Sequence, residues 1–119
     1  MNYGIVSNKT RDINYEIAIR VAKLIIDHGH TPVFEKSLSS VLKGAPEGTV
    51  FKDFDSIELK TIISVGGDGT FLSVVAGYRE LDTEFIGINK GSIGFLTEIN
   101  VEDLDCDIAL LTSGKYLTQ

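Results

Sequence analysis

The segment from Thr61 to Leu72 constrains the fold of this chain more than any other. It opens with Thr61-Ile62-Ile63-Ser64-Val65, a run typical of a buried strand, and continues directly into Gly66-Gly67-Asp68-Gly69-Thr70. Glycines allow sharp turns and positive φ angles that a Cβ would disfavour. Because a helical pattern follows at once, the amide groups of this turn stand at a helix start, where an anion is favoured.

Asp68 is the unexpected residue of the turn. A carboxylate among these amides would repel a phosphate, so a simple phosphate-binding turn does not account for it. The turn also lacks the lysine of G-x-x-x-x-G-K-[ST], and Leu72 stands where G-x-G-x-x-G needs its last glycine. Asp68 therefore suits a metal ligand, a general base or an acceptor for a hydroxyl. A plainer interpretation stays open, in which Asp68 only caps the helix.

Strand-like and helical patterns alternate along the whole chain. Strands are expected at 3–6, 31–34, 61–65 and 84–88. Helices are expected at 13–28, after Gly69 and after Asn100, with weaker turns at 37–42 and 53–57. This alternation is typical of one α/β domain with a mostly parallel sheet flanked by helices. We expect a single such domain over residues 1–119.

The two main helices differ in pattern. The first ends at Gly29, and its apolar stripe consists of Ile17, Val21, Leu24, Ile25 and His28. The second is apolar on most sides and is expected to be buried, with Phe71, Leu72, Val74, Val75 and Tyr78. Ligands bind at the carboxyl ends of parallel strands. Three loops leave such ends, at 7–12, 66–70 and 89–95, so we expect them to share one edge of the sheet.

Composition excludes several classes of function. The net charge of −6 argues against a nucleic-acid or anionic-membrane surface, since both need clustered Lys and Arg. Cys106 is the only cysteine, so no internal disulfide can form and a reducing, cytoplasmic setting is expected. No apolar run is long enough to cross a membrane. No metal-ligand cluster is visible in the sequence, so we expect no metal site built from protein ligands alone.

The turn at 66–70 resembles a signature shared by NAD kinases, diacylglycerol-type lipid kinases and phosphofructokinases. A second stretch, Gly87-Ile88-Asn89-Lys90-Gly91-Ser92-Ile93-Gly94-Phe95-Leu96-Thr97-Glu98, looks like the NAD kinase motif that follows the aspartate. The stretches typical of the lipid kinases and phosphofructokinases do not occur. The opening Gly4-Ile5-Val6-Ser7-Asn8 also looks like the first strand of NAD kinases. The resemblance spans nearly the whole chain and implies the Rossmann-like N-terminal domain of the phosphofructokinase-like superfamily.

The resemblance implies a reaction and roles for named residues. An NAD kinase transfers the γ-phosphoryl group of ATP to the 2′-hydroxyl of the adenosine ribose of NAD, which makes NADP. Asp68 would accept the proton of that hydroxyl, with Mg²⁺ or another divalent cation held mainly by the ATP phosphates. Gly66, Gly67, Gly69 and Thr70 would form the phosphate loop, while Gly69, Leu72 and Phe95 would contact NAD. Plain core packing is the alternative for Leu72 and Phe95.

Several polar residues of the loops could meet a phosphate. Lys9, Arg11 and Lys90 are candidates of this kind, although each is more often a solvated surface charge. Asn8 is a further candidate site residue. Asn89 could bind or could simply stitch the second glycine loop together.

NAD kinases carry a second, β-rich domain after the glycine-turn domain, and this sequence stops at Gln119. The chain is therefore interpreted as the N-terminal domain of an NAD kinase, with little activity alone and with homo-oligomers expected for the full-length protein. Inorganic polyphosphate stays open as a second phosphoryl donor. Two other functions stay open as well: a sugar-phosphate or lipid kinase of the same superfamily, and a non-catalytic nucleotide-binding module.

Overall fold

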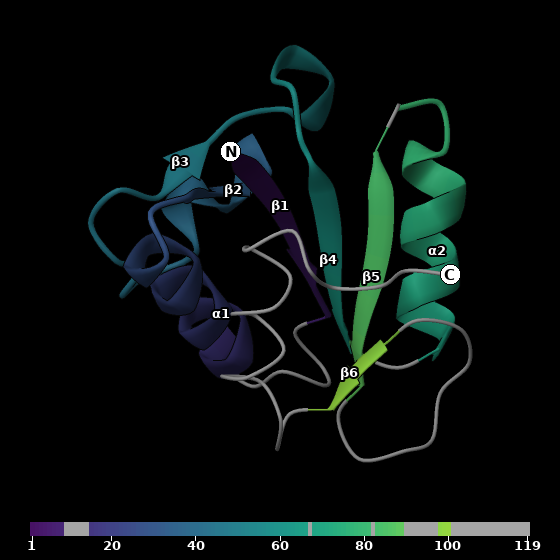
Figure 1. Ribbon diagram of the computed structural model, residues 1–119, viewed down its shortest axis with the longest axis horizontal. Coiled ribbons are helices and arrows are strands. Elements are labelled where there is room, and N and C mark those ends of the chain that lie inside the picture. Colours follow the sequence, from purple (N-terminus) through teal and green to yellow (C-terminus); the bar gives the residue numbers. More distant parts are fainter. Residues whose placement is uncertain (9–14, 67, 82, 90–97, 101–119) are drawn as a thin grey trace.

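The computed structural model describes residues 1–8, 15–66, 68–81, 83–89 and 98–100. Within these residues the strands are β1 (Asn2–Ser7), β2 (Thr31–Phe34), β3 (Val50–Phe51), β4 (Thr61–Gly66), β5 (Glu84–Asn89) and β6 (Glu98–Asn100). The α-helices are α1 (Glu16–Asp27) and α2 (Asp68–Tyr78), and two short 3₁₀ helices are η2 (Lys36–Ser40) and η3 (Phe54–Ser56). Figure 1 shows these elements along the chain.

All strands belong to one parallel sheet with the order β3-β2-β1-β4-β5-β6. The chain builds outward from β1 to β3, crosses back to the other side of β1, and then builds outward again through β4, β5 and β6. This order is the doubly wound arrangement of dinucleotide-binding domains. The expectation of an α/β fold with a mostly parallel sheet is confirmed.

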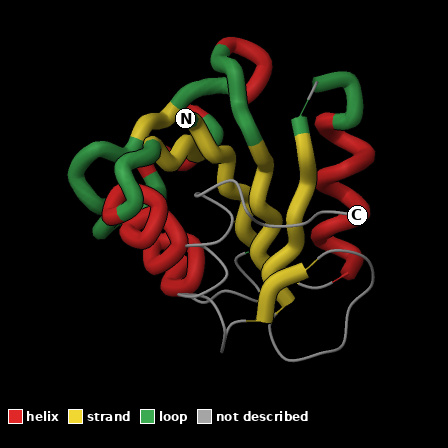
Figure 2. The backbone as a smooth tube through the Cα atoms, in the orientation of Figure 1, coloured by secondary structure: helices red, strands yellow, loops and turns green. Residues whose placement is uncertain are grey.

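The two helices cover opposite faces of the sheet. α1 packs against β1 and β2, and α2 packs against β4 and β5. Figure 2 shows the yellow strands lying between the two red helices. Because both faces are covered, every residue of β4 is buried and its sequence reads as a nearly continuous apolar run.

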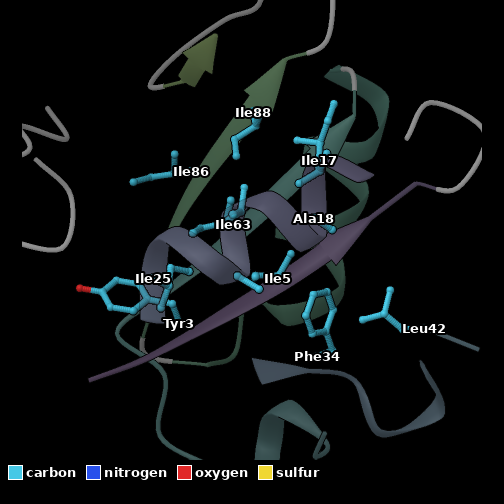
Figure 3. Close-up of a cluster of buried hydrophobic side chains, with 13 residues drawn as sticks. Tyr3, Ile5, Ile17, Ala18, Ile25, Phe34, Leu42, Ile63, Ile86 and Ile88 are labelled. Atoms are coloured by element: carbon cyan, nitrogen blue, oxygen red, sulfur yellow. The ribbon is translucent and has the colours of Figure 1, made fainter. Parts of the chain in front are cut away.

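The core consists of two clusters, one on each face. The larger cluster lies between the buried face of α1 and the sheet, and it includes Ile5, Phe34, Ile63 and Ile86 from four strands. Figure 3 shows these side chains gathered with Ile25 of α1. The smaller cluster lies on the α2 face and consists of Val33, Phe54, Leu59, Ile62 and Val74. Alternate residues of each strand serve the two clusters, as the period of a strand requires.

The end of α1 follows the expected pattern closely. His28 is the C-cap, and Gly29 follows it with φ +83. The Gly29 amide donates to the Ile26 carbonyl at 2.9 Å, and the His30 amide donates to the Ile25 carbonyl at 3.0 Å. These two bonds form a Schellman motif, which lets the chain reverse directly into β2.

Several expectations need correction. β3 and β6 were not expected as strands, since runs as short as Val50–Phe51 and Glu98–Asn100 carry too few residues to show a period. His28 is exposed, because it lies at the cap, where the helix turns away from the core. α2 begins at Asp68, ahead of Gly69, and it is only partly buried. The helix expected after Asn100 lies outside the described residues.

Candidate functional site

Strands β1, β4 and β5 end at the same edge of the sheet. Ser7 pairs with Val65, and Gly66 pairs with Asn89, so the loops that follow these strands start side by side. The expectation that they share one edge is therefore confirmed for the described residues. The strand order reverses between β1 and β4. In doubly wound sheets such a reversal opens the crevice in which ligands bind.

Gly66 makes the turn from β4 into α2. Its φ is +153, in a region that is almost restricted to glycine. A Cβ at this position would lie 2.7 Å from Oγ1 of Thr70, closer than real contacts allow. The backbone of Gly66 thus lies directly against the third residue of α2. Only glycine allows this approach, which brings the helix start to the end of the strand.

α2 begins at Asp68, so the aspartate singled out in the sequence is the first residue of a helix at the carboxyl edge. A helix N-terminus carries a positive partial charge, which favours the ionised form of a nearby carboxylate. The same end offers amide groups without intrahelical partners to an anionic ligand. The place of Asp68 in the fold therefore suits an interaction with the helix dipole and a role as proton acceptor.

Asn8 connects the end of β1 to the turn. Its backbone N–H donates to the carbonyl of Val65 at 3.1 Å. Its side-chain Nδ2 donates to Oγ1 of Thr70 at 3.0 Å, in a partly buried position. The sequence indicated Asn8 and Thr70 separately but not their contact. Both residues follow the carboxyl ends of strands, but no local pattern says that these two strands become neighbours, so the sequence alone does not give the contact.

Leu72 is an exposed apolar residue of α2 near the turn. Leu72 is 59% exposed, whereas the ring of Phe71 faces inward against Gly87 of β5. A Cβ at Gly87 would lie 3.0 Å from Cδ1 of Phe71, so helix and strand approach closely here. Leu72 is therefore not packed in the core, which was the plain alternative for this residue. The side chain is available to a ligand or a partner at this edge.

Ser64 lies two residues before Gly66 on β4 and faces the same side of the sheet as Ile62. Its side chain is 2% exposed, and within the described part of the chain its Oγ has no hydrogen-bond partner. A buried hydroxyl without a partner costs about 1–3 kcal/mol. A serine inside an apolar strand gives no local signal in the sequence, so this hydroxyl could not be singled out from the residues alone.

Other residues indicated by the sequence lie outside the described part: Lys9, Arg11, Gly67, Lys90 and Phe95. Among the residues that are described, no group of three or more His, Cys, Asp or Glu side chains is placed to hold a metal ion. None of the helices within the same ranges is both long and apolar enough to span a bilayer.

The family model described as ATP-NAD kinase N-terminal domain matches residues 3–116 of this chain. The chain belongs to the NAD kinase family. The match includes the glycine turn, the start of α2 and the opening strand with Asn8. The resemblance seen in the sequence is therefore confirmed.

Curated relatives from distant organisms agree with this assignment. An NAD kinase of Ectopseudomonas mendocina is 30% identical over 99% of this chain and 40% of its own length. An NAD kinase of Caldanaerobacter subterraneus is 29% identical over 95% of the chain and 40% of its own. An NAD kinase of Thermococcus gammatolerans is 29% identical over 98% of this chain and 41% of its own length. The chain thus spans about two-fifths of the length of these relatives.

Proposed function

We propose that this chain forms the glycine-turn half of an NAD kinase active site. In this proposal, the γ-phosphoryl group of ATP passes to the 2′-hydroxyl of the adenosine ribose of NAD, which yields NADP. The observation that carries it is the position of Asp68. In a chain of the NAD kinase family, this residue begins α2 at the edge where the strand order reverses.

Each part of the site then has one task. Asp68 accepts the proton of the ribose hydroxyl as the new O–P bond forms and the bond to ADP breaks. The amides of Gly66, Gly67 and Gly69, with the hydroxyl of Thr70, bind phosphate oxygens. Leu72 and Phe95 pack against the adenine, and the 59% exposure of Leu72 supports its part. Polar loop residues such as Asn89 and Lys90 complete the edge.

The divalent cation fits this site as part of the ATP complex. The described residues offer no cluster of metal ligands, and Mg²⁺ commonly keeps its waters and binds through substrate phosphates. When bound, the cation would neutralise charge on the transferring phosphoryl group. The curated relatives are more than twice as long as this chain, so we propose that the rest of the NAD pocket comes from a following domain.

The test is the formation of NADP by the full protein that carries this sequence, with NAD, ATP and Mg²⁺. We expect Asp68→Asn to lower kcat by about 10²- to 10⁴-fold, the usual contribution of a general base, with a small change in KM. Asp27→Asn, at the exposed end of α1, is the matched control and should keep full activity.

Three further outcomes separate the alternatives. Turnover with a sugar phosphate or a lipid in place of NAD would indicate another kinase of the same superfamily. Nucleotide binding without any turnover would indicate a binding module. The 119-residue chain alone should form little or no NADP, and robust turnover by it would contradict the proposed division of the site. Replacing ATP with polyphosphate tests the second donor.

A further inference from the structure

Asn8 contacts the glycine turn at both of its ends. The backbone N–H of Asn8 binds the carbonyl of Val65, the residue just before the turn. The side-chain amide of Asn8 binds Oγ1 of Thr70, the residue that completes the turn. Asn8, the residue that follows β1, therefore holds the entry and the exit of the segment that carries Asp68. The contacts lie where the strand order reverses.

The Thr70 hydroxyl is held from two sides. Its Oγ1 lies over the backbone of Gly66, where an added Cβ would be 2.7 Å away, and it accepts the amide of Asn8 at 3.0 Å. The hydroxyl consequently has a defined place, although it belongs to the first turn of a helix. First turns of helices lack the backbone hydrogen bonds that would fix them.

We propose that Asn8 is a positioning residue for the reaction: it closes the turn from Val65 to Thr70 and so fixes Asp68 and the amides of the helix start. This proposal rests on the proposed NAD kinase function for its kinetic part. Phosphoryl transfer depends mainly on alignment and charge neutralisation, so a turn of fixed geometry matters more than a strong base. Asn8 itself needs no contact with the substrate.

The direction of the hydrogen bond gives Asn8 a second effect. An asparagine amide donates, and a hydroxyl that accepts this bond still has its own proton to donate. Asn8 therefore leaves Thr70 ready to donate its hydroxyl proton to a phosphate oxygen. An aspartate at position 8 would be an acceptor only and would draw that proton to itself. The chemistry thus calls for an amide at this position and not merely for a polar side chain.

The kinetic test uses Asn8→Ala and Asn8→Asp in the full protein that carries this sequence. Both variants keep the backbone bond to Val65 and lose the amide bond to Thr70. We expect kcat to fall by about 10- to 100-fold, because a displacement of 1 Å at a reacting group can cost about 10²-fold. KM for NAD should stay within about threefold, since ground-state contacts are kept. In a Thr70→Val background, Asn8→Ala should add little, because both act through one bond.

Asn2→Ala is the matched control. Asn2 is the first residue of β1, whereas Asn8 follows its last residue, and Nδ2 of Asn2 donates to the carbonyl of Glu58 at 3.0 Å, at the opposite edge of the sheet. The substitution Asn2→Ala removes a hydrogen bond from a side-chain amide, as Asn8→Ala does, and it should leave kcat unchanged. A similar loss of kcat in Asn2→Ala and Asn8→Ala would overturn the proposal, because general loosening of β1 would then explain both.

Amide hydrogen exchange tests the clamp, meaning the two hydrogen bonds from Asn8 to Val65 and Thr70, without relying on activity. The amides of Leu72 and Ser73 are the first in α2 whose partners lie within the helix. Asn8→Ala should speed their exchange by about fivefold, as loss of one net hydrogen bond predicts. The amide of Tyr78 at the far end of α2 serves as reference and should not change.

The two measurements separate the clamp from the proposed function. If the full protein forms no NADP, the proposed function fails, and exchange at Leu72 and Ser73 alone decides whether Asn8 holds the turn. If the protein is active and Asn8→Ala keeps its kcat, the positioning role is wrong whatever the exchange shows. If Asn8→Ala does not fold, Asn8→Asp, which keeps the size of the side chain, gives the same readings.

Discussion

At the scale of single residues, Gly66 carries the strictest requirement of the turn. Its φ of +153 disfavours any residue with a Cβ, and the added atom would lie 2.7 Å from Oγ1 of Thr70. We expect Gly66→Ala to lower the free energy of unfolding by about 1–3 kcal/mol, the usual cost of such backbone strain. Urea unfolding of the 119-residue chain, followed by circular dichroism, measures it.

Gly77→Ala is the control for this substitution. Gly77 is an exposed residue of α2, and a Cβ added there meets nothing within 4 Å. Alanine is favoured over glycine within helices by roughly 0.5–1 kcal/mol, so Gly77→Ala should keep or raise stability. Equal losses in both variants would mean that the conformation of Gly66 has no special cost.

Sequence patterns predicted some of the important single residues of the site but not their contacts. They singled out the turn and Asp68, because a cluster of glycines between a strand and a helix has few other uses. They did not predict the contact of Asn8 with Thr70 or the buried hydroxyl of Ser64. Contacts of this kind depend on which strands become neighbours, and that order is not a local property of the sequence. They also placed Leu72 in a buried helix, although it is 59% exposed.

At the scale of elements, the far end of α2 is tied to β2. The hydroxyl of Tyr78 donates a hydrogen bond to Oε2 of Glu35, the residue after β2, and its ring lies 5.1 Å from that of Phe54. Burial raises the pKa of Tyr78 well above 10, and the bond to Glu35 and the charges of Glu35, Asp53 and Asp55 raise it further. The helix is thus anchored at both ends, by Thr70 and by Tyr78.

The hydrogen bond between Tyr78 and Glu35 makes the free energy of unfolding depend on pH in the alkaline range. An unfolded tyrosine loses its proton near pH 10, whereas folded Tyr78 keeps its proton to higher pH. The bond to Glu35 therefore stabilises the fold fully below about pH 10, and this contribution is lost as the pH rises further. We expect the free energy of unfolding to fall more steeply above pH 10 in the wild type than in Tyr78→Phe.

Urea unfolding at several pH values up to about 11 checks this difference. The pKa of Tyr3 is also raised, by burial and by the charge of Glu84, but Tyr3 is present in both proteins and cancels from the comparison. Below pH 9 the loss of the hydrogen bond should make Tyr78→Phe less stable by about 1 kcal/mol. Parallel pH profiles for the two proteins would show that the Tyr78 hydroxyl is not the responsible group.

Element boundaries were predictable where a residue fixes them. Gly29 ended α1 as expected, and Thr31–Phe34 formed β2 with the expected bounds. The start of α2 was harder, because glycines before and after Asp68 are compatible with turn and helix alike. β3 consists of two residues, and a pattern cannot indicate a strand of that length.

At the scale of the whole molecule, one sheet joins two cores. Ile25 of α1 is completely buried on one face, and Val74 of α2 is 5% exposed on the other. We expect Ile25→Ala to cost about 2–5 kcal/mol and Val74→Ala about 1–3 kcal/mol. Since the sites lie on opposite faces, their effects should add in the double variant. Far-ultraviolet circular dichroism and tyrosine fluorescence should still report one coincident transition.

Two separate transitions in either variant would contradict a single cooperative unit.

The general architecture was predictable from the alternation of strands and helices, which restricts a chain of this length to few arrangements. The order of the strands was not predicted, because local patterns do not say on which side of β1 the later strands join. That order is what brings Asn8 to Thr70.

The strand order also has a consequence in time. Tyr3 pairs with Thr61, which lies far along the sequence, so β1 is synthesised well before β4, its neighbour on the other side from β2. Until then β1 can pair only with β2, and contacts between distant segments form slowly. The edge at which β1 and β4 both end is complete only when the two halves of the sheet have met. Ligand binding at this edge would therefore report, during synthesis or refolding, the moment at which the central strands join.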